Sequence, residues 1–514
     1  MPVERELKLV APREDLIRLE RSPVLAGRGS APERQEQLDS TYFDTADARL
    51  ARRDLALRVR RTNGRYVQTL KRGGGVVRGE WETTLDGAQP EPGPLFVMAG
   101  EEDLVDLDVA ELRPVLTTRV ERRLQEIRID GHRGEHRIEV ALDLGELEAD
   151  ERRQPVAELE LELLEGEPAA LYELALELGR EVPLRLETLS KAARGEMLRT
   201  GLAPPWRKSL KVDLGDAETV DDAMAAIFGA CYEHWLANQA AAIDGRDSEG
   251  VHQLRVALRR LRSALVLFKQ ALPPDRLSTL KDESRTVVKG LGRARDLDVI
   301  SEQLVRPLCQ ARPDDRALEA LAARLDAARQ ATYAADVRPG LTAASYTLFT
   351  LDFGGWVAGR GWRDTASEIS TVQEGAITDF ARAMLDQRLK TVRKRGRGFA
   401  DLDAMQRHEL RIAIKKLRYA LDFTGSLFPR KRVKAMLKTL GDLQDGLGAA
   451  NDLALAGEQL RGIAGRARGT EARRVAEASG FVLGWHAAAI DGASKELKSL
   501  WRAFKAEPPP WRTG

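Results

Sequence analysis

The hydrophobic period of this chain changes near residue 200, and this change constrains the fold more than any other feature. Before it, apolar and polar residues alternate, as in residues 157–164, and Asn63-Gly64 separates two such segments. A period of two is typical of β-strands with unlike faces, and Asn-Gly is a strong hairpin signal. After it, apolar residues recur with the helical period of 3.6. We therefore predict a multidomain α+β protein, with an antiparallel sheet, open or closed into a barrel, followed by an all-α domain.

The chain is too long, at 514 residues, to form one hydrophobic core. A Gly- and Pro-containing stretch follows residue 200 and is typical of a linker. We predict a first domain over residues 1–203 with short helices near 13–21 and 168–178, a linker over 204–215, and a helical domain over 216–508. The first 200 residues are acidic and the rest are basic, although the net charge is only +1. This asymmetry indicates different electrostatic roles for the two domains.

The second half contains an internal repeat. Residues 252–265 read HQLRVALRRLRSAL and residues 408–421 read HELRIAIKKLRYAL. At the same interval, GLGRARDLD at 290–298 is matched by GLGAANDLA at 446–454. Two separate blocks at one gapless interval predict a duplicated unit, with pseudosymmetric repeats over about 216–370 and 371–508 in one helical-bundle domain.

Each repeat carries a basic stripe on one helix face. At 100° per residue, four basic or His positions of each copy fall together, apart from the apolar stripe. These positions are His252, Arg255, Arg259, Arg262, His408, Arg411, Lys415 and Arg418. A solvated basic face is the simplest interpretation. However, both copies lack acidic partners one turn away, and this favours the hypothesis that the stripes bind a polyanion.

Charged residues of the first half recur at strand spacing. Glu4, Glu6 and Lys8 lie at i, i+2 and i+4, so they share one face of a strand, and Arg58 with Arg60 shows the same spacing. A solvated edge strand would explain each pattern alone. If these faces point into a barrel, however, the interior must hold ions or a ligand, because uncompensated buried charge is prohibitive. Carboxylates suit Mg²⁺ or Mn²⁺, and Arg and Lys suit phosphates, so the pattern predicts metal-assisted phosphoryl chemistry.

Five motifs in order resemble the signature of CYTH domains, the triphosphate tunnel metalloenzymes. They are Glu4-x-Glu6-x-Lys8, Thr41-Tyr42-Phe43-Asp44-Thr45, Leu57-Arg58-Val59-Arg60, Glu158-Leu159-Glu160 and Leu189-Ser190-Lys191-Ala192-Ala193-Arg194-Gly195. The paired His-x-x-Leu-Arg blocks and the segment around Arg295-Asp296-Leu297-Asp298 resemble the CHAD domain, which is associated with polyphosphate binding. The order of the two domains is similar to that of bacterial inorganic triphosphatases.

The resemblance implies an eight-stranded antiparallel tunnel that binds triphosphate and a divalent metal, Mg²⁺ or Mn²⁺. The metal ligands it implies are Glu4, Glu6, Asp143, Glu158 and Glu160. The triphosphate-binding residues it implies are Lys8, Arg58, Arg60, Lys71, Arg119, Arg122 and Lys191. Because Arg119 and Arg122 have an odd separation, they lie on opposite strand faces unless a bulge intervenes, so one of them is expected to be structural. The catalytic residues are expected to be Glu158, Glu160 and Lys8.

We expect hydrolysis of inorganic triphosphate to pyrophosphate and phosphate in the tunnel, and polyphosphate binding by the basic helical domain. The alternatives are an adenylate cyclase of the same fold, a thiamine triphosphate or nucleotide triphosphatase, and a non-catalytic polyphosphate scaffold. Nucleic acid is not expected as a partner, because few aromatic residues interleave the basic stripes. With two cysteines and no visible signal peptide or long apolar stretch, we expect a cytoplasmic protein with no membrane partner.

Overall fold

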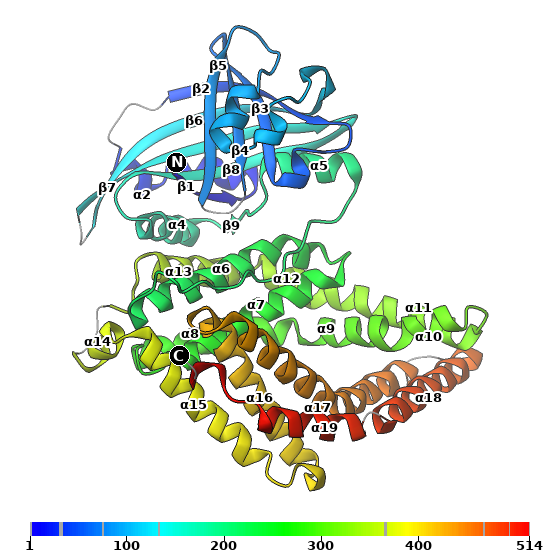
Figure 1. Cartoon of the computed structure of the whole chain (residues 1–514). Helices are drawn as coiled ribbons and strands as arrows, with labels where there is room; N and C mark the ends of the chain where they lie inside the picture. The colour runs from blue at the N-terminus through cyan, green and yellow to red at the C-terminus, as the bar shows by residue number, and fades with distance from the viewer. Residues whose placement is uncertain are drawn as a thin grey trace. The chain divides into compact units, whose positions relative to one another are not determined.

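The computed structural model describes residues 3–29, 34–73, 77–131, 134–363, 367–465, 468–492 and 494–512 (Figure 1). The chain forms two compact units. The first comprises Met1–Trp206, Leu236–Asp247 and Leu341–Gly361, and the second comprises Arg207–Trp235, Ser248–Gly340 and Trp362–Gly514. Because these units do not follow single stretches of chain, the domain boundaries inferred from the sequence stay a prediction.

The first unit is built on an antiparallel sheet with the strand order β5-β4-β3-β2-β6-β7-β8-β1-β9. The strands are β1 (Val3–Val10), β2 (Arg34–Thr45), β3 (Leu55–Thr62), β4 (Arg65–Arg72), β5 (Val77–Leu85), β6 (Leu112–Gly131), β7 (Gly134–Ala149), β8 (Arg152–Glu165) and β9 (Arg185–Leu186). β1 also pairs with β5, over three residue pairs. The eight long strands therefore wrap around a tunnel-like interior without full closure, and the predicted antiparallel tunnel with a following helical domain is confirmed.

Both faces of this sheet are buried along β1 and β8. Leu7, Leu9, Leu159 and Leu161 are fully buried on the outer face, where α1 (Arg13–Leu19) and α4 (Ala169–Glu181) contact these strands. The alternate residues point to the inner face, which carries the charged positions of both strands. The alternation read from the sequence therefore separates a leucine-rich outer layer from a charged interior.

α5 (Lys191–Thr200) begins where the Ser190 side chain accepts a hydrogen bond from the backbone N–H of Ala193. This helix packs on β6, β7 and β8. A Cβ atom at Gly195 would clash with the side chain of Leu116 on β6, so glycine allows this close approach without a shift of Leu116. Ser190 and Gly195 together place the first turn of α5 against the sheet.

The remaining helices complete both units (Figure 1). They are α2 (Pro23–Ala26), α3 (Gly93–Ala99), α6 (Val220–Asp244), α7 (Ser248–Leu267), α8 (Pro274–Gly290), α9 (Gly292–Val299), α10 (Arg306–Ala311), α11 (Arg316–Thr332), α12 (Arg338–Thr342), α13 (Ala344–Ala358), α14 (Ser367–Glu374), α15 (Ile377–Arg395), α16 (Ala404–Thr424), α17 (Arg430–Ala464), α18 (Gly469–Gly492) and α19 (Ser494–Ala506). Short 3₁₀ segments occur at Ala51–Arg53, Glu102–Leu104, Val109–Glu111, Phe399–Asp401, Gly425–Leu427 and Pro510–Arg512, and π-helical turns at Ile300–Val305 and Tyr333–Val337.

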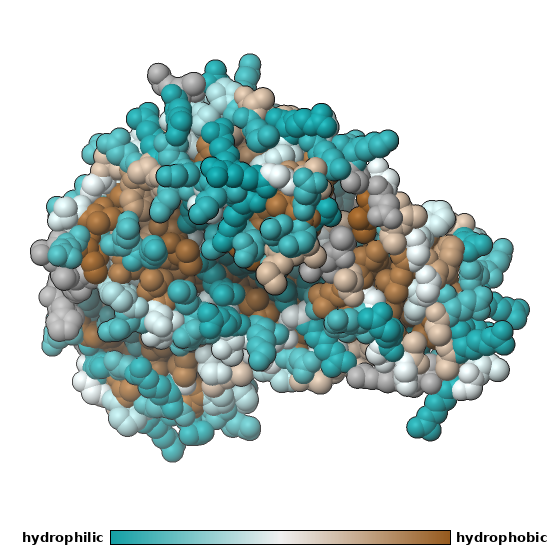
Figure 2. All heavy atoms as spheres, turned by 90° about the horizontal axis from the view of Figure 1, so that it is seen from below, coloured by the Kyte–Doolittle hydropathy of each residue, from teal (hydrophilic) through white to brown (hydrophobic). Residues whose placement is uncertain are grey.

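The helices of the second unit are amphipathic. The buried side of α7 includes Leu254, Leu258 and Leu261. On α16 the equivalent positions Leu410, Ile414 and Leu417 are buried. Figure 2 shows hydrophilic side chains spread over the face in view, with smaller apolar areas between them. Among the described residues, no helix combines the length and apolar content that a membrane span requires.

Candidate functional site

The register of four neighbouring strands brings charged residues together inside the tunnel. Lys8 of β1 pairs with Glu160 of β8, Glu158 of β8 pairs with Asp143 of β7, and Asp143 pairs with Arg122 of β6. Directly opposed residues of antiparallel strands lie on the same face of the sheet. Residues as far apart in the sequence as Lys8 and Glu160 therefore meet on one inner surface.

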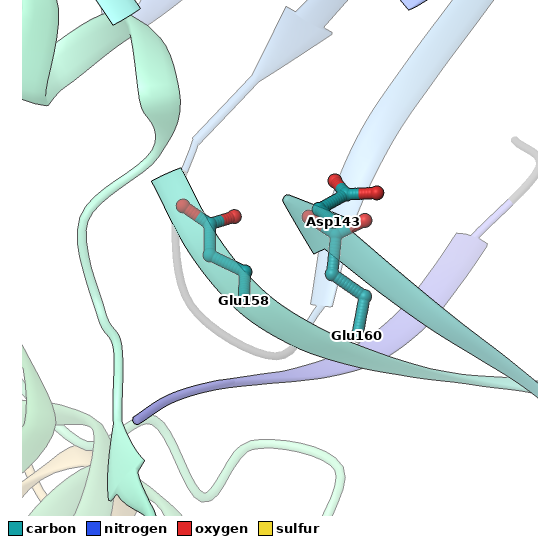
Figure 3. Close-up of side chains that lie close together, drawn as sticks. All are labelled: Asp143, Glu158 and Glu160. Carbon is teal, nitrogen blue, oxygen red and sulfur yellow. The ribbon is translucent and has the colours of Figure 1, made fainter. Parts of the chain in front are cut away.

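The centre of this surface is an acidic triad formed by Asp143, Glu158 and Glu160. One carboxylate oxygen of each residue lies within 4.8 Å of the others, and Figure 3 shows the three side chains gathered on β7 and β8. Asp143 and Glu158 are fully buried and Glu160 nearly so. Three converging carboxylate oxygens are the donor set that Mg²⁺ and Mn²⁺ prefer, so these residues fit a divalent metal.

A backbone contact beside the triad requires glycine. A Cβ atom at Gly145 would clash with the carbonyl oxygen of Arg119 on β6. The absence of a side chain therefore lets β7 approach β6 two residues after Asp143.

Two lysines lie among the carboxylates. Lys191 Nζ lies 2.9 Å from Asp143 Oδ2, 2.6 Å from Glu158 Oε2 and 2.9 Å from Glu160 Oε1. Lys8 Nζ lies 2.8 Å from Glu160 Oε1, 3.5 Å from Glu6 Oε1 and 3.8 Å from Glu158 Oε2. Lys191 thus contacts all three members of the triad, whereas Lys8 lies nearer the Glu160 side.

Two arginines complete the ring of cations. Arg122 donates from Nε to Asp143 Oδ1 at 2.6 Å and from Nη2 to Asp143 Oδ2 at 2.7 Å, and its Nη2 also donates to Glu160. Arg194, one turn after Lys191 on α5, donates to Glu158. Sequence reasoning assigned no role to Arg194, although its i, i+3 spacing from Lys191 places both on one helix face.

The charges of these groups stabilise one another. Burial alone would raise the pKa of Glu160, but the positive charges of Lys191, Lys8 and Arg122 hold it well below its usual value. Burial would lower the pKa of Lys191, but Asp143, Glu160 and Glu158 raise it above its usual value. The carboxylates are therefore ionised and the ammonium is protonated at neutral pH.

A second group of cations lies on β3 and β4. Arg58 Nη2 donates to Thr69 Oγ1 at 2.9 Å, and Thr69 Oγ1 donates to Glu82 Oε1 at 2.8 Å. Lys71 Nζ lies 2.7 Å from Glu80 Oε2. Glu80 and Glu82 therefore pair with the Arg58–Lys71 group.

Arg60 is the least neutralised cation of this face. It donates from Nε to Ser40 Oγ at 3.3 Å, and among the described residues it forms no ion pair within 4.0 Å. Burial, together with the positive charges of Arg58 and Arg122, lowers the pKa of Arg60 to about 10. A group of cations that repel one another in a buried position favours an anion.

Tyr42 of β2 is a further residue of this face that sequence reasoning did not assign. It is opposite Arg58 in the register and is almost fully buried. Burial would raise its pKa, but the positive charges of Arg58, Lys191 and Arg60 lower it below the usual value. Its position in the Tyr42-Phe43-Asp44 motif was the available signal.

The remaining predicted tunnel residues divide into two groups. Glu6 is buried near Lys8, and together with burial its charge raises the pKa of the neighbouring Glu162 to about 7. Glu4 belongs to β1, but its side chain lies outside the described residues. Arg119 is exposed and pairs with Glu146 and Glu148, so it is not brought to the triad. Of the two arginines on β6, Arg122 is the one on the inner face.

In the helical unit, the stripes of α7 and α16 approach each other at Lys415. Burial lowers the pKa of Lys415, and so do the charges of Arg259, Arg411 and Arg262. Within the described part of the chain, Arg259 Nε is buried without a hydrogen-bond partner. These four residues form a positively charged centre, which we call the interhelix basic cluster.

Arg255 and Arg411 occupy equivalent positions in the two repeats. Arg255 Nη1 donates to the carbonyl of Val288 at 3.2 Å, and Arg411 Nε donates to that of Gln444 at 3.3 Å. Arg411 Nη2 also lies 3.3 Å from Asp452 Oδ2. Asp296 is the equivalent of Asp452 in the first repeat, and its negative charge stabilises the protonated form of Arg255. The duplication therefore extends from the sequence to the contacts.

The other stripe residues have different surroundings. Burial and the charges of Arg295 and Arg259 lower the pKa of His252 to about 4. His408 is exposed, and Arg418 lies over the ring of Tyr419 at 5.9 Å from its centroid. Burial and Arg285 lower the pKa of Arg262.

Both halves of the chain match known protein families. Residues 3–195 match the family described as the CYTH domain, and residues 226–461 match the CHAD domain. An inorganic triphosphatase from Haemophilus influenzae is 30% identical over 182 residues, which cover 34% of this chain and 51% of that protein. The match thus spans about half the length of this curated relative.

Two solved structures are similar. The crystal structure of the CHAD domain from the plant Ricinus communis is 32% identical and covers 60% of this chain and 98% of that chain, with a TM-score of 0.49. A Hippeastrum protein named as an adenylyl cyclase and described as having a dominant triphosphatase activity is 21% identical. It covers 40% of this chain and 98% of that chain, with a TM-score of 0.28.

Proposed function

The chain combines a CYTH domain with a CHAD domain, and from this premise we propose that its CYTH domain is a metal-dependent inorganic triphosphatase. The observation that carries the proposal is the triad of Asp143, Glu158 and Glu160, whose oxygens converge within 4.8 Å inside a tunnel lined by cations. Pure anion binding would gain nothing from buried carboxylates. Metal-assisted phosphoryl transfer requires both kinds of group.

The triad, with Glu6 and Glu4, would hold Mg²⁺ or Mn²⁺. A divalent metal held by these carboxylates would supply Lewis-acid chemistry, which neutralises negative charge on a bound phosphoryl group. Glu158 or Glu160 would accept a proton from the attacking water, and Lys8, which lies beside both, would stabilise charge on the phosphoryl oxygens.

The leaving pyrophosphate would be bound by the second group of cations. Arg58, Arg60 and Lys71 lie on the inner face of β3 and β4, and Arg60 is available to an anion because it forms no ion pair among the described residues. Arg122 and Lys191 contact the triad in this structure, so both lie within reach of a phosphoryl group bound beside it. Arg119 has no part in this proposal, because it is exposed on the other face.

An activity screen tests the proposal. Triphosphate, ATP and thiamine triphosphate would each be incubated with Mg²⁺ or Mn²⁺, and phosphate, pyrophosphate and cyclic AMP would be quantified. We expect triphosphate to be the best substrate and Glu160→Gln to lower kcat by about 100-fold or more. Glu196→Gln, which removes a carboxylate of α5 that pairs with Arg199, is the matched control. Cyclic AMP as the main product, or a fully active Glu160→Gln variant, would contradict the proposal.

For the CHAD domain we propose polyphosphate binding at the interhelix basic cluster. The supporting observation is that burial and the positive charges of Arg259 and Arg262 lower the pKa of Lys415. Among the described residues, none of these three cations forms an ion pair. Clustered cations without carboxylate partners attract a polyanion.

Titration of the full chain with long-chain polyphosphate at rising salt tests this second function. We expect Lys415→Ala to weaken binding and to reduce the slope of log affinity against log salt by about 1. Lys416→Ala, an exposed neighbour on α16, is the control. Absence of binding at low salt, or preference for duplex DNA, would contradict the assignment.

A further inference from the structure

The ammonium group of Lys191 occupies the centre of the acidic triad. Its Nζ lies between 2.6 and 2.9 Å from one oxygen each of Asp143, Glu158 and Glu160. These are the three residues whose oxygens converge for a metal. Mg²⁺ coordinates such oxygens at about 2.0–2.1 Å. A cation held by the same oxygens would overlap with Nζ, so the ammonium and the metal exclude each other.

Lys191 differs from the other cations around the triad in how it is held. Lys8 belongs to the paired strand β1, and its ammonium contacts the carboxylates of Glu160, Glu6 and Glu158. Arg122 approaches Asp143 and Glu160 from β6. Lys191 is the first residue of α5 and reaches the triad through its four-carbon side chain. Rotation of this side chain would clear the centre of the triad without movement of any strand.

We propose that Lys191 is an internal competitor for the divalent metal, which displaces its ammonium from the triad. The proposal rests on the metal site proposed above. It gives Lys191 two alternative partners: the carboxylates before the metal binds, and a substrate phosphate afterwards. Metal and triphosphate therefore bind cooperatively, because the metal releases the cation that the anion needs.

Mn²⁺ titration of the full chain, followed by the electron paramagnetic resonance signal of free Mn²⁺, tests the proposal without any measurement of activity. Lys191→Met, which keeps the length of the side chain and removes its charge, should bind Mn²⁺ about 10-fold more tightly or better. Arg199→Met, on the same helix, removes a partner of Glu196 that lies outside the triad and should leave the affinity unchanged. Equal or weaker binding by Lys191→Met overturns the proposal.

Two further measurements separate the possible failures. Glu160→Gln should weaken Mn²⁺ binding, and an unchanged affinity would overturn the metal site itself. Where Lys191→Met fails to fold, as judged by circular dichroism, acetylation of the wild-type chain replaces it, with peptides quantified by mass spectrometry. Mn²⁺ should increase acetylation of Lys191 several-fold relative to the exposed Lys208. No increase overturns the proposal.

Discussion

Arg122 holds Asp143 with two nearly parallel hydrogen bonds, at 2.6 Å from Nε and 2.7 Å from Nη2. This paired geometry is specific to a planar guanidinium. The same Nη2 reaches Glu160, so one side chain fixes two members of the triad.

Arg122→Lys should therefore impair the enzyme although it keeps the charge. A lysine cannot form both bonds, so Asp143 and Glu160 lose their fixed orientation. We expect kcat/KM for triphosphate to fall by about 10-fold or more. Steady-state kinetics measures the effect, with the exposed Arg119→Lys as the matched control. Equal losses in both variants would show that the paired geometry is unimportant.

Arg194→Ala should destabilise the first unit. It removes a buried partner of Glu158, although Lys191 remains at 2.6 Å. We expect the free energy of unfolding to fall by about 1–3 kcal/mol. Denaturant unfolding followed by circular dichroism provides the measurement. Arg199→Ala, which breaks a partly exposed pair with Glu196, should cost about 0–1 kcal/mol. A smaller loss for Arg194→Ala than for Arg199→Ala would refute the expectation.

Gly145→Ala should be more damaging than an ordinary Gly→Ala substitution. Its Cβ would clash with the Arg119 carbonyl, and β7 would have to move away from β6 beside Asp143. We expect reduced thermal stability and weaker Mn²⁺ binding together. Gly87→Ala is the control, since a Cβ there meets no atom within 4 Å. Similar melting temperatures for the two variants would contradict the packing argument.

The stability of the helical unit should fall as the pH falls from about 6.5 toward 4. Burial and neighbouring arginines lower the pKa of His252 and of His234 to about 4 in the folded chain. Unfolded histidine titrates near 6.5, so between these values the unfolded chain binds more protons, and protonation favours unfolding. His252→Gln should flatten the dependence measured by urea unfolding. His408→Gln, at the equivalent but exposed position of the second repeat, is the matched control.

The sequence allowed the two halves, the repeat and most charged tunnel positions to be predicted, because each depends on a short local pattern. Alternation in β1 and β8 identified Lys8, Glu158 and Glu160 as residues of one strand face. The odd spacing of Arg119 and Arg122 indicated that only one of these two arginines faces the tunnel in a regular strand. The identity of the inward arginine required the register of β6 against β7, which depends on pairing between distant segments.

The residues that were missed depend on tertiary packing. Arg194 meets Glu158 only because Gly195 lets α5 lie against Leu116. Tyr42 joins the cations only through its register with Arg58. Neither contact produces a periodic pattern in the sequence from which it could be predicted. The roles assigned to the tunnel residues and to the basic stripes stay predictions until the experiments above are done.

The two buried faces of β1 have a consequence for how the chain reaches its native state. A slip of one residue against β8 would turn Leu7 and Leu9 into the charged tunnel, and Glu6 and Lys8 into the leucine layer. Both errors are costly, and neither can compensate the other. A misaligned pairing of β1 is therefore disfavoured on both faces of the sheet at once, so this strand fixes its register with β8 strongly.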